Sequence, residues 1–260
     1  MILDDIIAHK CEEVAAARRA RPLAEVREQA KAAPAARDLR TALRLKGISL
    51  IAEVKRASPS RGAILPDVDA VELAALYEQC GARAISVLTD AKFFQGSLAD
   101  LTTVRQNVAV PVLRKEFIID EYQIYEARAA LADAILLIVR CLTDQQLADY
   151  LKRSQSLGMH ALVEAHNEAE IARAVSARAH IIGINNRDLD TLEVDLNTSL
   201  ELKRRVPGGH VLVSESGIQS RSQVKSLEDG GVDGILVGES LMTSNDIEAK
   251  IGELLGRDEG

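Results

Sequence analysis

Aromatic residues and cysteine are scarce in this chain. It has no tryptophan, and phenylalanine, tyrosine and tryptophan together make up 3% of its 260 residues. The three cysteines, Cys11, Cys80 and Cys141, lie far apart and form no CxxC or Cys/His pattern, so we expect reduced thiols and no structural zinc site. The histidines also lack ligand spacing and are expected to be structural or surface residues rather than metal ligands: His9, His160, His166, His180 and His210.

Long apolar runs and basic segments are absent as well. The longest apolar stretch, Ala134–Val139, is far too short to span a membrane. Residues 1–21 carry acidic side chains and lack the continuous apolar core of a secretory signal, so the expected compartment is the cytoplasm. The formal net charge is -7 and no basic run is interleaved with aromatics, which argues against nucleic acid as a partner. An acidic chain can still bind a small anion, because the local field at the site decides this.

What the chain does have is apolar material in short, regularly repeated runs. Hydrophobic residues make up 47% of the sequence, enough for a sizeable core. The runs are rich in Ile, Val and Leu, which is typical of parallel strands covered on both faces. Eight such strands are predicted, at Ile48–Val54, Ala84–Leu88, Val110–Leu113, Ala134–Val139, Met159–Val163, His180–Ile184, His210–Val213 and Gly234–Val237.

Amphipathic stretches alternate with these runs and predict helices. Several begin at a capping residue, as at Thr143, Asn167 and Ser220. The alternation predicts a single α/β domain over residues 1–260, a (β/α)8 TIM barrel with eight βα units in residues 46–260. An open doubly wound sheet is the competing fold. The closed barrel is preferred because the count is eight and polar residues recur at equivalent points around it. The predicted helices include Asp69–Gln79, Leu98–Gln106, Glu121–Leu131, Asp144–Ser156, Glu168–Val175 and Arg221–Glu228.

Residues 1–45 stand outside this alternation. Leu3, Ile6 and Val14 have helical spacing, and Pro22 and Pro34 divide the segment. We expect an extra helical extension packed on the barrel. Two roles stay open for it: plugging the barrel, or helping to cover the active site.

Polar residues occupy the predicted carboxyl ends of five strands. Reacting groups in barrel enzymes lie at those ends, and alternate residues of a strand point to the same side. Each polar residue has the same parity as apolar residues earlier in its strand, so all are expected to face one mouth of the barrel. These candidate catalytic residues are Glu53, Lys55, Lys115, Glu164, Asn185 and Glu215.

Glycine turns after the seventh and eighth strands predict a phosphate site. Barrels bind phosphate with these two loops and a short helix, where backbone N–H groups approach the anion. We expect the side chain of Glu239 to point outward, since a carboxylate is unfavourable beside an anion. Serines after the first strand are further hydroxyl donors. The candidate residues are Ser58, Ser60, Ser216, Gly217, Gly238 and Glu239.

Five segments together resemble the indole-3-glycerol-phosphate synthase family. They are Glu53–Ser60, Leu88–Ser97, Leu113–Phe117, Gly183–Leu189 and Ser214–Ile218. The resemblance implies conversion of 1-(2-carboxyphenylamino)-1-deoxyribulose 5-phosphate to indole-3-glycerol phosphate, CO2 and water in tryptophan biosynthesis. It also implies that no cofactor or metal is needed. The expected partner is this phosphorylated small molecule. We expect a monomer, with contact to other tryptophan-pathway enzymes left open.

The residues suit the steps of this reaction. Lys115 is the candidate acid that polarises the ketone during ring closure, and Lys55 is the candidate cation for the substrate carboxylate and a second acid. Glu164 and Glu53 are candidate bases for the dehydration. Asn185 and Glu215 are expected to bind sugar hydroxyls, Arg187 to orient carboxylates, and an apolar wall to hold the aromatic ring: Phe94, Phe117, Leu136 and Leu189.

Three other functions are weighed against this one. A sugar-phosphate isomerase of the preceding step relies, in its family, on a cysteine at the first strand and an aspartate at the sixth, where this chain has Glu53, Lys55 and Asn185. A Schiff-base aldolase would use Lys115 as nucleophile. A non-catalytic barrel that binds phosphate or a partner would be expected to lack some of the charges at the mouth, and none is missing.

Overall fold

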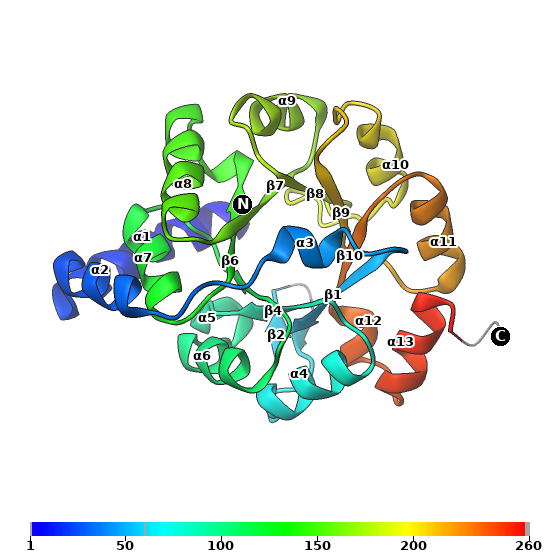
Figure 1. Ribbon diagram of the computed structural model, residues 1–260, viewed down its shortest axis with the longest axis horizontal. Coiled ribbons are helices and arrows are strands. Elements are labelled where there is room, and N and C mark those ends of the chain that lie inside the picture. The colour runs from blue at the N-terminus through cyan, green and yellow to red at the C-terminus, as the bar shows by residue number, and fades with distance from the viewer. Residues whose placement is uncertain (1, 60, 258–260) are drawn as a thin grey trace.

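Eight parallel strands close into a barrel in the computed structural model, which describes residues 2–59 and 61–257 (Figure 1). The first strand pairs with both the last and the second, so the sheet has no free edge. The predicted TIM barrel is therefore confirmed, and the open doubly wound sheet is wrong. The strands, in their order around the barrel, are β1 (Ser49–Val54), β10 (Gly234–Val237), β9 (Val211–Glu215), β8 (Ile181–Asn185), β7 (His160–Ala165), β6 (Ala134–Ile138), β5 (Val112–Lys115) and β4 (Ala84–Leu88).

Helices form a ring outside the strands. Their starts follow local capping chemistry: the side chain of Thr143 accepts a hydrogen bond from the N–H of Gln146, and that of Asn167 accepts one from Glu170. The ring consists of α4 (Ala70–Gln79), α6 (Leu98–Asn107), α7 (Glu121–Ala129), α8 (Asp144–Ser156), α9 (Glu168–Ser176), α10 (Asn197–Lys203), α11 (Arg221–Asp229) and α13 (Ile247–Leu255). Short elements in the loops are β2 (Ala57–Ser58), β3 (Gly62–Ala63), α5 (Ala91–Phe94), η1 (Val139–Cys141) and α12 (Glu239–Met242). None of the helices in the described ranges is both long and apolar enough to cross a membrane.

Several strands run further than the apolar runs indicated. β5, β7, β8 and β9 each continue past the apolar run and end on or just after the polar residue that was predicted at the carboxyl end of the strand. The backbone ladder continues through these residues, because pairing depends on main-chain groups and not on the polarity of the side chain. Glu164, Asn185 and Glu215 are thus held by strand hydrogen bonding, which fixes their direction.

Two separate apolar layers lie on either side of the sheet. Ile51, Leu113 and Leu162 belong to the layer inside the barrel, whereas their strand neighbours Leu50 and Val112 belong to the layer between strands and helices. The predicted alternation along the strands is therefore present. The inward-facing apolar residues fill the interior of the barrel. The polar residue at the carboxyl end of each inward-facing row lies at the mouth.

The N-terminal extension consists of α1 (Ile2–Ala20), α2 (Leu23–Ala32) and α3 (Leu39–Leu43). Leu39 and Leu43 of α3 pack into the inner layer, and α3 lies across the amino-terminal opening of the barrel (Figure 1). Ile2 and Ile6 of α1 line a cavity at the other end. Both roles left open by the sequence are present, each in a different helix.

A buried cluster of charges holds α1 on the barrel. The ammonium of Lys10 lies 2.9 Å from Asp90 Oδ2 and 3.1 Å from Glu116 Oε1, and it also pairs with Glu13. Lys10, Asp90 and Glu116 are all buried. Burial disfavours the charged amine, but the neighbouring carboxylates outweigh it and raise the pKa of Lys10. The cluster joins the N-terminal helix to the loops after β4 and β5.

We predict that Lys10→Met lowers the free energy of unfolding by about 3–5 kcal/mol, because it leaves two buried carboxylates without their shared cation. Urea denaturation followed by circular dichroism measures the loss. Lys31→Met is the matched control: Lys31 pairs with Glu28 on the surface of α2, and its removal should change stability by less than about 1 kcal/mol. Equal stabilities of the two variants would contradict the anchoring role of Lys10.

Candidate active site

A cavity of about 860 Å³ opens at the carboxyl ends of the strands. Every candidate residue whose placement the structure describes lies on its wall, whereas Ser60 lies outside the described residues. The polar members come from β1, β5, β7, β8 and β9 and from the loops that follow β1, β8, β9 and β10. The wall contains Glu53, Lys55, Ser58, Phe94, Lys115, Phe117, Leu136, Glu164, Asn185, Arg187, Leu189, Glu215, Ser216, Gly217, Gly238 and Glu239.

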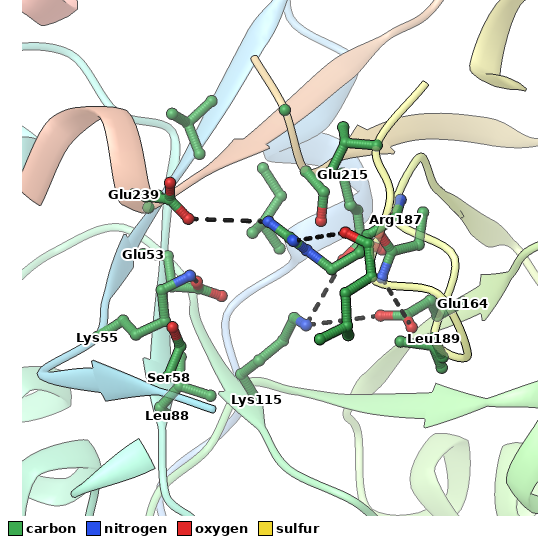
Figure 2. Close-up of a pocket in the computed structure, with 18 of the residues that line it drawn as sticks. Glu53, Lys55, Ser58, Leu88, Lys115, Glu164, Arg187, Leu189, Glu215 and Glu239 are labelled. Carbon is green, nitrogen blue, oxygen red and sulfur yellow. Dashed lines mark hydrogen bonds and ion pairs between the residues drawn. The ribbon is translucent and has the colours of Figure 1, made fainter. Parts of the chain in front are cut away.

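Lys115 occupies the centre of the cavity floor (Figure 2). Its Nζ lies 3.5 Å from Glu164 Oε2 and 3.7 Å from Glu215 Oε2, so one ammonium is shared by carboxylates of two other strands. Burial of Lys115 opposes its charge, but the field of Glu164, Glu215 and Glu53 raises its pKa. The raised pKa favours the ammonium form, which can donate a proton, over the neutral amine that a nucleophile needs.

Glu164 is held as an anion. Burial alone would raise the pKa of this carboxyl, but Lys115, His166 and Asn185 together lower it below its usual value. Asn185 donates a hydrogen bond from Nδ2 to Glu164 Oε1 at 3.2 Å, and its own Oδ1 accepts one from the N–H of Arg187. One oxygen of Glu164 is thus engaged from behind, while the other faces Lys115.

Glu215 is in the opposite electrostatic situation. It is fully buried, neither oxygen has a hydrogen-bond partner in residues 2–59 and 61–257, and Glu164 lies close by. Burial first, and then the charge of Glu164, raise its pKa to about 8 in spite of Lys115. Gly183 makes the position possible, because a side-chain carbon there would overlap Glu215 Oε1. The pair of carboxylates thus has one permanent anion and one member that titrates near neutrality.

A second lysine–glutamate pair lies across the cavity. Lys55 Nζ is 3.0 Å from Glu53 Oε1, and both side chains are largely buried. Gly238 packs against this carboxylate: a Cβ added there would come within 2.7 Å of Glu53 Oε1. The cavity therefore contains two lysines, each with its own carboxyl partners: Lys55 with Glu53, and Lys115 with Glu164 and Glu215 (Figure 2).

The loops after β9 and β10 have the backbone geometry of an anion site. Ser216 and Gly217 both have positive φ, 69° and 81°. Asn186 donates a hydrogen bond to the carbonyl of Ser216 at 3.0 Å, which turns the N–H of Gly217 away from Asn186 because the two groups of a trans peptide point in opposite directions. Gly238 precedes α12, whose first N–H groups have no partner within that helix. Both loops line the same cavity, an arrangement that suits an anion site made of backbone N–H groups.

Glu239 does not point outward, and the expectation for its side chain is wrong. Its carboxylate lines the cavity, with Oε1 2.6 Å from Arg61 Nη2 and Oε2 3.8 Å from Arg187 Nη2. The expectation considered only repulsion from an anion. Two guanidinium groups from different loops compensate the carboxylate and leave this rim with net positive charge.

Apolar side chains form the remaining wall. Phe94 and Phe117 face each other with ring centroids 6.1 Å apart, and Leu136 and Leu189 extend the surface. Part of this wall comes from α1, whose residues were not among the candidates for the apolar wall: Ile2, Leu3 and Ile6. The helical spacing of that segment predicts an apolar stripe, but not what the stripe contacts.

His166 was expected to be a structural or surface histidine. It is largely buried directly behind Glu164, with Nε2 3.3 Å from Glu164 Oε1. Its contact with Glu164 was not predicted, although residue 166, one position beyond the end of β7, has the same parity as Glu164. Within residues 2–59 and 61–257, no group of three or more His, Cys, Asp and Glu side chains is arranged to hold a metal ion.

Comparisons with known proteins agree with this geometry. The sequence profile described as indole-3-glycerol phosphate synthase matches residues 3–254. The chain belongs to the indole-3-glycerol phosphate synthase family. It is therefore a carboxy-lyase of tryptophan biosynthesis, as the motifs predicted.

Relatives of that name cover nearly the whole chain. The protein of Mycolicibacterium vanbaalenii is 49% identical over 254 residues, which is 98% of this chain and 93% of the relative. That of Roseiflexus sp. is 49% identical over 264 residues, 98% of each chain, and that of Chlorobaculum tepidum is 47% identical over 247 residues, 94% and 96%.

Solved structures of other enzymes share the fold of this synthase. A 3-hexulose-6-phosphate synthase superposes with a TM-score of 0.65 at 17% identity, covering 80% of this chain and 99% of its own. Thiamine phosphate pyrophosphorylase from Pyrococcus furiosus superposes with a TM-score of 0.62 at 18% identity, covering 85% and 98%. At this level of identity the likeness extends to the barrel alone.

We predict that Gly183→Ala lowers kcat of the synthase by about ten-fold or more, because the added methyl group displaces the carboxylate of Glu215 from its place beside Lys115. Steady-state kinetics of indole-3-glycerol phosphate formation measure the change. Gly208→Ala is the matched control, since a Cβ at this surface glycine meets nothing within 4 Å. Unchanged kcat in Gly183→Ala would mean that the position of Glu215 is unimportant for turnover.

We also predict that Glu215→Gln stabilises the protein increasingly as pH rises. The folded-state pKa of about 8 lies above the usual carboxyl value near 4.3, so the stability linked to this group is complete below about pH 4 and is lost as pH rises through 8. Glutamine does not titrate, so the variant should exceed the parent by at least about 1 kcal/mol at pH 8 and by much less at pH 5. Urea denaturation at both pH values tests this, with Glu201→Gln on the exposed face of α10 as the control for loss of one charge. A difference that does not grow with pH would contradict the raised pKa.

Proposed function

We propose that this chain carries out its ring closure by acid–base catalysis with Lys115 as the acid, on 1-(2-carboxyphenylamino)-1-deoxyribulose 5-phosphate. The observation that carries this assignment is the ammonium of Lys115, buried in the mouth and shared by Glu164 and Glu215. A proton delivered from Lys115 to the ketone oxygen makes the carbonyl carbon electrophilic enough for the aromatic carbon to attack it.

The second pair, Lys55 and Glu53, is proposed to act on the carboxylate and in the dehydration. The Lys55 ammonium holds the substrate carboxylate until it leaves as CO2, which restores the aromatic ring. Elimination of water then needs a proton removed from one atom and another given to the departing hydroxyl. Glu53 lies 3.0 Å from Lys55, a spacing that suits an acid and a base acting together.

Glu164 is proposed as the base that works with Lys115. While Lys115 is charged, it lowers the pKa of Glu164, so this carboxylate is a weak base. Once Lys115 has given its proton to the substrate, that field disappears and Glu164 becomes the stronger base. Asn185 and Glu215 are proposed to bind sugar hydroxyls, for which Glu215 has two oxygens that accept no hydrogen bond from residues 2–59 and 61–257.

The remaining contacts follow from the shape of the cavity. The phosphate is proposed to bind at the loops of Ser216, Gly217 and Gly238, with Ser58 and the positive rim of Arg187 nearby. Glu239 compensates part of that charge. The anthranilate ring is proposed to lie on the apolar wall, where flat surface excludes water: Phe94, Phe117, Leu136 and Leu189.

Further properties belong to the same proposal. We propose that residues 1–260 form one catalytic domain, with residues 1–45 as an extension, acting as a cytoplasmic monomer. Few large apolar side chains are exposed in the described ranges, and they do not make an extended patch: Leu45, Leu65 and Val194. The charge state of Lys115 disfavours the Schiff-base aldolase, because that mechanism needs the neutral amine.

We predict that Lys115→Met lowers kcat by about 10²–10⁴-fold while the barrel remains folded, because the ketone loses its proton donor. Incubation with the carboxyphenylamino-ribulose phosphate, followed by indole fluorescence, measures turnover; the absence of tryptophan keeps the background low. Lys152→Met, on the exposed face of α8, is the control and should be unaffected. Near-normal turnover of Lys115→Met would refute its role as acid, and borohydride trapping of a lysine adduct would favour the aldolase.

A further inference from the structure

His166 belongs to a buried arrangement that the proposed mechanism does not use. It follows β7 directly, and its imidazole lies between two carboxylates. Nε2 is 3.3 Å from Glu164 Oε1, and Nδ1 is 3.2 Å from Glu170 Oε2. The ring is not on the cavity wall, so it reaches the substrate only through Glu164.

The outer carboxylate is itself fixed by the start of α9. Glu170 Oε2 also accepts a hydrogen bond from the N–H of His166 at 2.8 Å, and Oε1 accepts one from Asn167 Nδ2 at 2.9 Å. Asn167 in turn caps α9 by accepting from the N–H of Glu170. Glu170 and Asn167 therefore hold the imidazole from one side, in a rigid turn between strand and helix.

The inner carboxylate has two differently used oxygens. Oε1 of Glu164 faces His166 and Asn185, whereas Oε2 faces Lys115 at 3.5 Å. A carboxylate held at one oxygen by two groups cannot rotate without losing both contacts. The direction of Oε2 toward Lys115 thus depends on what binds Oε1.

We propose that His166 is a positioning residue of the synthase: as an imidazolium clamped between Glu170 and Glu164, it keeps Glu164 ionised and directs Oε2 of Glu164 at Lys115. The inference rests on the proposed role of Lys115 and Glu164. None of the proposed reaction steps uses a histidine, so this role of His166 is additional to them.

The charges around the imidazole favour its protonated form. Burial opposes the charge of His166, but Glu164 and Glu170 outweigh this and raise its pKa to about 10. A cation therefore remains beside Glu164 when Lys115 gives its proton to the substrate. The other titratable and charged groups that act on His166, Glu164 or Glu170 are Lys115 on β5, Glu215 on β9, Arg140 and Cys141 on η1, and Asp188 after β8.

The direct test is a ¹⁵N NMR titration of the histidine side chains in the full chain. His166, assigned by its absence in His166→Gln, should stay an imidazolium to at least about pH 8. Glu170→Gln should lower its midpoint by about one pH unit or more, because one flanking carboxylate is gone. A midpoint near the ordinary value of about 6.5 in the unsubstituted protein would overturn the proposal.

Kinetics test the consequence for catalysis. His166→Gln should lower kcat about ten-fold at neutral pH, with KM within about two-fold, and the deficit should grow as pH falls because Glu164 protonates more readily. His160→Gln is the matched control: His160 begins the same strand and pairs with Asp38 at 2.9 Å, far from the mouth. Equal kcat values for the two variants would overturn the positioning role.

The experiments also distinguish failure of this proposal from loss of folding and from failure of the proposed function. If His166→Gln loses its thermal unfolding transition, Glu170→Gln serves in its place, and its kcat should then fall at alkaline pH as His166 loses its proton. An unchanged alkaline profile in a folded Glu170→Gln would overturn the proposal. If the unsubstituted chain fails to convert the carboxyphenylamino-ribulose phosphate, the proposed function fails, while the NMR titration still decides the charge of His166.

Discussion

A lysine ammonium can lie largely buried at the mouth of this barrel because carboxyl groups of two other strands, those of Glu164 and Glu215, lie within 3.7 Å of it. Lys115 would otherwise lose its proton or leave the cavity, since desolvation of an isolated charge is far more costly than any single contact can offset. The arrangement needs β5, β7 and β9 to end at the same level. It is the closure of the sheet that brings strands so distant along the chain to one rim.

The groups around each carboxyl group also determine how Glu164 and Glu215 differ in charge. Glu164 has three donors around it and remains an anion, whereas Glu215 pairs with Lys115 but has no hydrogen-bond partner among the described residues. Two glutamates on β7 and β9, the strands on either side of β8, thus differ in basicity because of what surrounds them. Burying the Glu215 carboxyl group without hydrogen bonds from the described residues lowers the stability of the fold, as is common at functional sites.

Much of this could be predicted from the sequence, because one rule governs both fold and site. Period-two alternation identifies the strands and also the side to which Glu53, Lys115 and Glu164 point. The direction of Glu239 could not be predicted, since it depends on Arg61 and Arg187 from two other loops. The separate roles of α1 and α3 could not be predicted either. An apolar stripe shows that one face of a helix is buried, but it does not show which part of the protein packs against that face.

The cluster around Lys10 has a bearing on how substitutions in α1 are interpreted. Lys10 lies one turn after Ile6, which lines the cavity, and it binds Glu116, the residue after Lys115. The helix that lines the cavity and the strand that carries Lys115 are therefore held by the same cluster of charges. A kinetic defect caused by a change in α1 reports on two things at once, contact with the ligand and the seating of β5, and only a double-mutant cycle between helix and strand separates them.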